Sequence, residues 1–194
     1  MPKSLKKQQK RKLIAKSTCD LFIKKGFVNI SISEIAKVAG IGKGTVYEYF
    51  ENKEDIVFEL MSCLQEDYDP KLNENLKSST TSKEKLKHLF ALYLSDDTIV
   101  QTQRNIYKEF IAITLNNPSE AITKYQDTMM DKYTNILLGI FHEGINKNEI
   151  KEESIKLVPS IFATLEGFFV ARKSKEDILE YIENLFKLIE IKKD

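Results

Sequence analysis

The chain has 194 residues, 42% hydrophobic and 30% charged, which is enough to bury a core in one or two globular domains. No stretch approaches the ~20 apolar residues of a membrane span, and the basic amino terminus lacks the apolar core of a signal peptide. We therefore expect a cytoplasmic protein without a membrane partner. Cys19, Cys63 and the two histidines lack metal-ligand spacing, so we predict no metal site and no cofactor. Both cysteines are interpreted as small buried hydrophobic residues, with a redox role as the alternative.

Charge is unevenly distributed along the chain. Residues 1–53 contain 12 Lys or Arg and 4 Asp or Glu, a net charge of +8, whereas the remaining residues contain 18 and 25, a net charge of −7. A basic segment joined to an acidic one is typical of a nucleic-acid-binding module attached to a domain with another task. We predict two domains, a DNA-binding domain over residues 1–52 and a second helical domain over residues 53–194.

The first predicted helix runs from about Leu5 to Lys25 and ends at Gly26. Helical spacing places five side chains on its inner face: Leu13, Ile14, Ser17, Leu21 and Phe22. The early cations either contact DNA phosphate or the minor groove, or form a solvated arm, and a charge run alone does not decide between the two. These cations are Lys3, Lys6, Lys7, Lys10, Arg11 and Lys12.

Residues 31–53 predict a helix, a tight turn and a second helix. Ser31 and Glu34 have the spacing of a capping box, and Gly40 stands where a helix often ends in a left-handed conformation. The second helix should bury Val46 and Phe50 and turn a lysine, hydroxyls and glycines outward, where they can contact phosphates and base edges. The alternative is a surface hairpin whose tyrosines cover the core. The candidate DNA-binding residues are Ser31, Ser33, Gly42, Lys43, Gly44, Thr45, Tyr47, Tyr49 and Lys53.

This segment resembles the DNA-binding signature of the tetracycline-repressor (TetR) family. The matching positions are Ile35-Ala36, Ala39-Gly40-Ile41, Gly44-Thr45-Val46-Tyr47, Tyr49-Phe50, Lys53 and Ile56. The chain departs from the pattern at Ser31, where the family has threonine, and at Gly42, where it usually has the serine that caps the recognition helix. Glycine is a tolerable cap but removes one side-chain contact with phosphate. The resemblance implies a three-helix helix-turn-helix domain.

The remaining sequence predicts further helices and no strands. A long helix from Lys53 should connect the two domains and bend or stop at Asp69-Pro70. Capping pairs, paired acids or prolines mark the later helix starts. These signals are Thr81 with Glu84, Asp96-Asp97, Pro118 for a helix over 118–146, a helix over about Glu152 to Arg172 with Pro159 inside, and Ser174 with Asp177. The predicted fold is all-α.

The last two helices have apolar faces suited to pairing with other helices. In the family that the chain resembles, these helices pair with their copies in a second subunit as a four-helix bundle. A symmetric pair of helix-turn-helix domains reads a palindromic double-stranded DNA operator, so we predict a homodimer. Ordinary packing within one chain is the alternative. The predicted interface residues are Phe168, Ile178, Ile182 and Leu185.

The middle helices of the same family enclose a ligand cavity, which implies a small-molecule effector. Aromatic residues at helical spacing are more often core than pocket. As a set they predict an apolar pocket with a few polar groups, such as Glu109 and Glu166, for a hydrophobic or amphipathic molecule. The aromatic set is Phe90, Tyr93, Tyr107, Phe110, Tyr133, Phe141, Phe162 and Phe169.

We predict a sequence-specific DNA-binding transcriptional regulator. Repression, the commoner mode of the family, would end when the effector binds. One alternative is a DNA-binding protein without an effector, which organises DNA or responds to a protein partner. Another is an enzyme that uses Glu109, His142 or Glu143 as acid or base, but no nucleophile motif, phosphate loop or metal-spaced cluster supports it, and we predict no catalytic residue.

Overall fold

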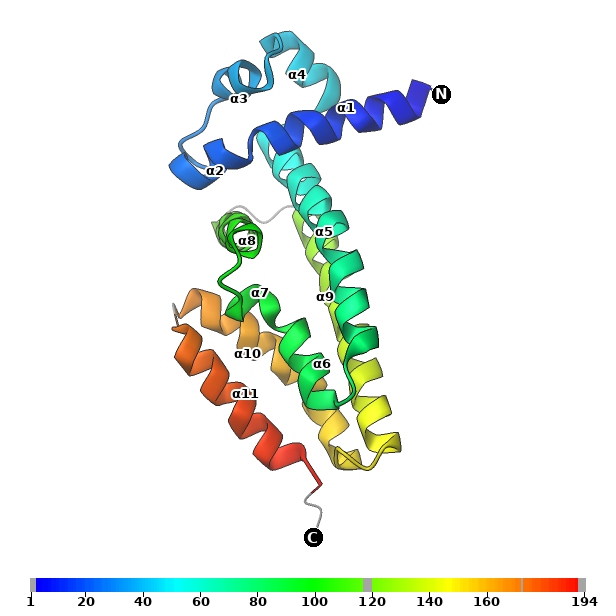
Figure 1. The fold of residues 1–194 in the computed structure, drawn as a ribbon. Coiled ribbons are helices and arrows are strands. Elements are labelled where there is room, and N and C mark those ends of the chain that lie inside the picture. The colour runs from blue at the N-terminus through cyan, green and yellow to red at the C-terminus, as the bar shows by residue number, and fades with distance from the viewer. Residues whose placement is uncertain (1–2, 117–119, 172, 192–194) are drawn as a thin grey trace. The chain divides into compact units, whose positions relative to one another are not determined.

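The computed structural model describes residues 3–116, 120–171 and 173–191, which are helical almost throughout (Figure 1). No strand is found in these ranges, where one isolated antiparallel bridge joins Ile150 to Glu190. The predicted all-α fold is confirmed. Pro118, expected at a helix start, lies outside the described residues. None of the described helices combines the length and the apolar character that crossing a bilayer requires.

The chain divides into two compact units, and two of its helices contribute to both. Unit 1 comprises residues 1–69 and 101–119, and unit 2 comprises residues 70–100 and 120–194. Compact units are not the same as functional domains, so the predicted end of the DNA-binding domain at residue 52 stays a prediction. Unit 1 contains α1 (Lys3–Ser17), α2 (Cys19–Lys25), α3 (Ile32–Ala39), α4 (Lys43–Tyr49), the first part of α5 (Lys53–Ser78) and most of α8 (Thr98–Asn116). Unit 2 contains the remainder of α5 and α8, and also α6 (Ser82–Leu89), α7 (Ala91–Leu94), α9 (Glu120–Asn146), the 3₁₀ turn η1 (Glu152–Leu157), α10 (Val158–Val170) and α11 (Lys175–Ile189).

The ends of α3 follow from its sequence. The Ser31 hydroxyl accepts a hydrogen bond from the Glu34 amide at 3.3 Å, and the Glu34 carboxylate accepts one from the Ser31 amide at 2.9 Å. At the other end Gly40 has φ 66° and ψ 33°, a left-handed conformation that strains residues with a Cβ. The predicted capping box and turn are therefore confirmed, as are the capping boxes that open α6 and α11.

The first predicted helix is divided in two at Thr18. The buried Thr18 side chain and its amide both donate to the carbonyl oxygen of Ala15, at 2.7 Å and 3.0 Å. A hydroxyl that bonds locally to the backbone competes with the helical ladder, so α1 ends here and α2 begins. Leu13 does not face inward as expected, because 65% of its surface is exposed, whereas Ile14 and Phe22 are buried.

Two prolines behave differently from the sequence expectation. Pro70 lies inside α5, which continues from Lys53 to Ser78 without interruption. Pro159 was expected inside a helix, but the 3₁₀ turn ends at Leu157 and α10 begins at Val158. Pro159 therefore lies in the first turn of α10, where a missing amide proton costs no helical hydrogen bond.

Each unit has its own apolar core. Unit 2 includes a close helix approach at Gly144, where a Cβ would collide with Ser82 Oγ and lie 2.6 Å from Ile150 Cδ1. A larger residue at position 144 would therefore require the side chains of Ser82 and Ile150 to shift. Fully buried side chains include Phe22, Ile35, Val46, Ile56 and Leu60 in unit 1, and Leu86, Phe90, Leu137, Phe141, Leu165 and Ile182 in unit 2.

Candidate functional site

The helix α4 has one buried side and one exposed side. Val46 and Phe50 have 0% and 2% of their surface exposed and anchor the helix in unit 1. On the opposite side Lys43 and Gly44 are exposed, and Tyr47 is 54% exposed. No atom lies within 4 Å of a Cβ placed at Gly44, so the backbone is open to a close approach there. This surface offers a cation, a phenol and bare backbone to a partner.

The other predicted DNA-binding residues flank this surface. Ser31 and Ser33 are exposed at the start of α3, which packs against α4. Thr45 and Tyr49 are half-buried on α4. Gly42 begins α4 with φ −71° and ψ 151° and provides no side-chain cap. The candidates thus belong to one helix-turn-helix, as the sequence predicts.

Lys53 differs from the expected exposed phosphate ligand. Its ammonium group donates to the carbonyl oxygens of Phe27 at 2.7 Å and Ile30 at 3.0 Å, and more weakly to that of Val28 at 3.4 Å. The same nitrogen lies 4.2 Å from the centroid of the Phe27 ring. Lys53 therefore ties α5 to the loop between α2 and α3, and its contact with phosphate stays a prediction.

Glu109, on α8, holds the same loop from another side. Its carboxylate accepts a hydrogen bond from the Phe27 amide at 2.7 Å. The neighbouring Gly26 has φ 71°, and a Cβ there would lie 3.3 Å from Glu109 Oε2. From the sequence, Glu109 is a candidate pocket residue or acid–base group, because nothing in its local pattern signals a partner 82 positions away. In the structure its role within unit 1 is to fix the segment that enters the helix-turn-helix.

Arg11 fastens α1 to α4 and α5. Its guanidinium donates to Glu59 Oε2 and Asp55 Oδ1, both at 2.8 Å, and to the carbonyl oxygen of Tyr49, and it lies 4.4 Å from the centroid of the Phe50 ring. Two further pairs follow along the same helices: Lys12 with Glu66 at 2.5 Å and Lys16 with Asp67 at 2.7 Å. These cations serve the α1–α5 contact, which matching charges at helical spacing on both segments could have indicated.

The predicted pocket aromatics are divided between the units. Tyr107 and Phe110 belong to unit 1, where their rings stack at a centroid distance of 6.1 Å. The other six belong to unit 2, and of these Phe90, Phe141 and Phe162 are buried in its core. Within each unit these rings contribute to packing. Their contact with a ligand stays a prediction.

Tyr93 has the most distinctive environment of this set. Its ring lies 4.6 Å from the ring of Phe169, and only 9% of its surface is exposed. Burial raises the pKa of its hydroxyl well above the ordinary value, and the nearby Glu166 and Tyr133 raise it further. We find no hydrogen-bond partner for the hydroxyl among the described residues. A contact between this hydroxyl and a ligand stays a prediction.

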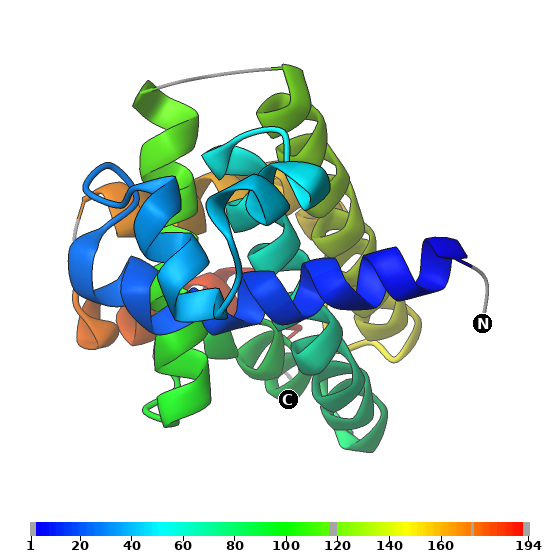
Figure 2. The same cartoon turned by 90° about the horizontal axis from the view of Figure 1, so that it is seen from above.

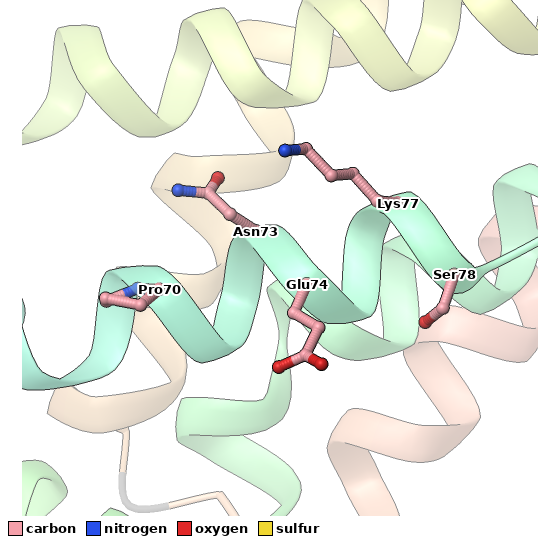
Figure 3. Close-up of a pocket in the computed structure, with 5 residues that line it drawn as sticks. All are labelled: Pro70, Asn73, Glu74, Lys77 and Ser78. Atoms are coloured by element: carbon pink, nitrogen blue, oxygen red, sulfur yellow. The ribbon is translucent and has the colours of Figure 1, made fainter.

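A surface depression along α5 does not match the predicted pocket (Figure 3). All of its lining residues come from a single helix, most are polar, and none belongs to the aromatic set. Figure 3 shows these side chains projecting from the helix surface. Such a lining is poorly suited to an apolar ligand. The lining residues are Pro70, Asn73, Glu74, Lys77 and Ser78.

The predicted interface residues lie mostly inside unit 2. Ile178, Ile182 and Leu185 have 5%, 0% and 7% of their surface exposed, which leaves little to offer a second subunit. Phe168 is half-buried and packs edge-on against Tyr181, with ring centroids 5.3 Å apart. Other apolar residues on α10 and α11 are exposed, namely Val170 at 62%, Leu188 at 69% and Leu179 at 36%.

Two of the candidate acid and base groups, Glu109 and Glu143, have structural partners. Glu143 pairs with Lys147 at 2.7 Å and with Lys85 at 2.5 Å, and these hydrogen-bonded lysines lower the pKa of its carboxyl.

Both cysteines are free, and burial raises the pKa of the Cys63 thiol to about 11. A thiol held protonated in this way is a poor nucleophile, which agrees with a packing role.

The sequence of this chain is similar to those of known bacterial regulators. Residues 14–60 match the family model described as bacterial regulatory proteins, tetR family. The chain is 28% identical over 193 residues to the fatty acid metabolism regulator protein of Bacillus subtilis (strain 168), and the alignment covers 94% of this chain and 95% of that protein.

Solved structures share the fold over nearly the whole chain. The crystal structure of the transcriptional regulator FadR from Bacillus subtilis in complex with stearoyl-CoA matches with a TM-score of 0.65 and 26% identity, covering 91% of this chain and 95% of that one. A TetR-family transcriptional regulator from Cytophaga hutchinsonii matches with a TM-score of 0.78 and 22% identity, covering 97% and 98%.

Proposed function

We propose that this chain, which belongs to the TetR family of transcriptional regulators, is a repressor that binds a palindromic operator as a homodimer and leaves it when a small amphipathic ligand binds. The observation that carries the proposal is the exposed face of α4, which presents Lys43, Gly44 and Tyr47 on a helix anchored by buried Val46 and Phe50. Exposed cations and hydroxyls beside an open backbone suit contacts with phosphates and base edges in the major groove.

The DNA contacts that we propose have two kinds of donor. Lys43 supplies charge to a phosphate, and Tyr47 supplies a hydroxyl from the same exposed face. Ser31, Ser33 and Thr45 add hydroxyls at the edges of the helix-turn-helix. Tyr49 is half-buried and its carbonyl accepts from Arg11, so its contribution is partly structural. We propose that the DNA-binding domain ends near residue 52, where α5 begins.

Dimerisation through α10 and α11 would use their exposed faces. Ala163, Gly167 and Val170 recur at helical spacing on the exposed side of α10, and nothing lies within 4 Å of a Cβ at Gly167, so a second helix could approach closely. Tyr181 and Leu188 recur in the same way on α11. We therefore shift the predicted interface from Ile178, Ile182 and Leu185 to these residues together with Phe168.

We propose a long-chain acyl-CoA as the class of effector. The support is the similarity over nearly the full chain to a fatty acid metabolism regulator and to FadR, whose crystal structure contains stearoyl-CoA. An acyl chain needs an apolar lining, which the aromatic residues of unit 2 would provide, and the Tyr93 hydroxyl could donate to a carbonyl oxygen. Since a regulator must reach its operator, we propose that the protein acts in the bacterial cytoplasm.

The test starts from DNA selected from a random duplex library with the purified protein. Affinity for the selected duplex is then measured with and without stearoyl-CoA, with free coenzyme A as the control. We expect 5- to 150-fold weaker operator binding in the presence of stearoyl-CoA, the usual size of coupling between two sites. If stearoyl-CoA binds but operator affinity is unchanged, the effector proposal fails. The alternative then remains a DNA-binding regulator that responds to another signal.

A further inference from the structure

The first residues of α1 lie before the segment that matches the family model. The match begins at residue 14, whereas α1 begins at Lys3. The first residues of the helix therefore lie outside the matched segment but belong to the same helix. Figures 1 and 2 show α1 continuing past α3 and α4 toward the amino terminus. The structure shows that this segment is helical, and both sequence alternatives, a contact with DNA and a solvated arm, stay open at this point.

The cations of α1 separate into two groups. Arg11, Lys12 and Lys16 are paired with carboxylates of α5. Lys6, Lys7 and Lys10 have no ion pair in the part of the chain that the structure describes; Lys6 and Lys7 are exposed and Lys10 is half-buried. Structural pairing thus accounts for the first group and leaves the second, which we call the basic stripe, without an internal role.

Helical periodicity shows which side of α1 carries Lys7 and Lys10. Lys10 and Lys7 precede Ile14 by four and seven residues, so they share its side of the helix. Ile14 is 2% exposed, and α1 packs against α3. Lys7 and Lys10 therefore continue, toward the amino terminus, the side of α1 that is buried at Ile14, and Lys6 lies one residue before Lys7.

Arg11 holds the amino-terminal part of α1 at a fixed place relative to α4. Its guanidinium bonds to the carbonyl oxygen of Tyr49, the last residue of α4, and to two carboxylates of α5. A helix rises about 1.5 Å per residue, so Lys7 lies about 6 Å and Lys6 about 7.5 Å along the axis from Arg11. The basic stripe therefore starts within about two helical turns of the end of the recognition helix.

We infer that the basic stripe of Lys6, Lys7 and Lys10 is a second DNA contact, which binds phosphates flanking the sequence that α4 reads. This inference rests on the proposed function, because it requires α4 to lie in the major groove. Its partner is the duplex backbone, so the contact adds affinity and salt dependence without adding sequence information. Its rigid helical state means that little conformational entropy is lost on binding.

The test compares two duplexes that contain the same selected operator. One ends at the outer edges of the half-sites, and the other extends about one helical turn, 10 bp, beyond each edge. The variant K6Q/K7Q/K10Q keeps good helix formers at all three positions. A control variant, K71Q/K124Q/K156Q, loses the same charge at exposed lysines of unit 2.

On the long duplex we expect at least tenfold weaker binding by K6Q/K7Q/K10Q, and a log–log salt slope smaller in magnitude by about 0.9 for each phosphate that the variant no longer neutralises. On the short duplex the variant should bind like the original protein. Three results would overturn the inference. K6Q/K7Q/K10Q could bind both duplexes equally weakly, or the control variant could bind the long duplex as weakly as K6Q/K7Q/K10Q does. The third is that K6Q/K7Q/K10Q binds the long duplex as tightly as the original protein. If the original protein selects no operator, the proposed function itself has failed, which is a separate result.

Discussion

The Glu109 carboxylate on α8 accepts a hydrogen bond from the backbone amide of Phe27 at 2.7 Å, in the loop that leads into the helix-turn-helix. Lys53 binds the carbonyl oxygen of the same residue at 2.7 Å. We predict that Glu109→Ala lowers the free energy of unfolding by about 1–3 kcal/mol, because the partly buried amide loses a charged acceptor.

Glu109→Gln is the matched comparison, since it keeps an acceptor oxygen of similar size. Chemical denaturation monitored by circular dichroism measures both variants. Glu109→Gln should retain most of the stability that Glu109→Ala loses. Equal stability of Glu109→Ala and the original protein would show that the hydrogen bond does not hold the loop.

Stability of the helix-turn-helix should fall in acid because of Glu34. The hydrogen bond from Lys25, together with those from the Ser31 amide and hydroxyl, lowers the pKa of its carboxyl from 4.5 to about 2. A carboxyl with a lowered folded-state pKa stabilises the fold above its unfolded pKa, and this contribution is lost as the pH falls toward 2. Glu34→Gln should be less stable than the original protein at pH 7, and the difference should shrink below pH 4. Denaturation midpoints of both proteins between pH 2 and pH 7 test this prediction. A stability difference that does not change with pH would show that the charge of Glu34 is not its source.

Gly42→Ser should stabilise α4. Gly42 has the extended backbone of a helix cap, φ −71° and ψ 151°, but no side chain to bond the free amides. The nearest atom to an added Cβ is Thr45 Oγ1 at 3.8 Å, so serine fits without a clash. We expect a gain of roughly a few tenths of a kcal/mol in the free energy of unfolding, together with tighter operator binding from one more hydroxyl. Lower stability of this variant would show that a serine at position 42 does not cap α4.

A charge at Leu188 should separate the proposed dimer. Leu188 is 69% exposed in the single chain, so Leu188→Glu leaves the core intact but buries a carboxylate in the proposed interface. Sedimentation should show monomers that retain their helical circular dichroism. Ile99→Glu, at a residue with 66% exposure outside α10 and α11, is the control and should stay dimeric. A dimeric Leu188→Glu variant would place the interface elsewhere.

Local signals made the helix-turn-helix predictable. The capping box of Ser31 and Glu34, the turn at Gly40 and the inward Val46 and Phe50 act within a few residues, and the family match over residues 14–60 confirms the resemblance. Long-range contacts could not be predicted in the same way. Lys53 carries the family pattern but directs its charge to backbone carbonyls, because the loop after α2 returns to it in the fold.

The helices of unit 2 show a second limit of sequence reasoning. Ile178, Ile182 and Leu185 repeat at the spacing of a helix interface, but periodicity does not distinguish a partner subunit from the protein's own core. In the structure these side chains are buried within unit 2. Aromatic residues raised the same ambiguity, since Phe90 and Phe141 pack fully in the core while Tyr93 keeps a hydroxyl for which we find no partner among the described residues.

The most direct test of the DNA-binding account is operator affinity of Lys43→Ala as a function of salt. Lys43 is exposed on α4 and adds nothing to the core, so the variant should fold normally. We predict weaker binding and a log–log salt slope smaller in magnitude by about 1 for each lysine–phosphate pair removed, while Lys156→Ala, an exposed lysine of unit 2, leaves both unchanged. If Lys43→Ala binds the operator with the affinity and salt slope of the original protein, α4 is not the helix that reads DNA.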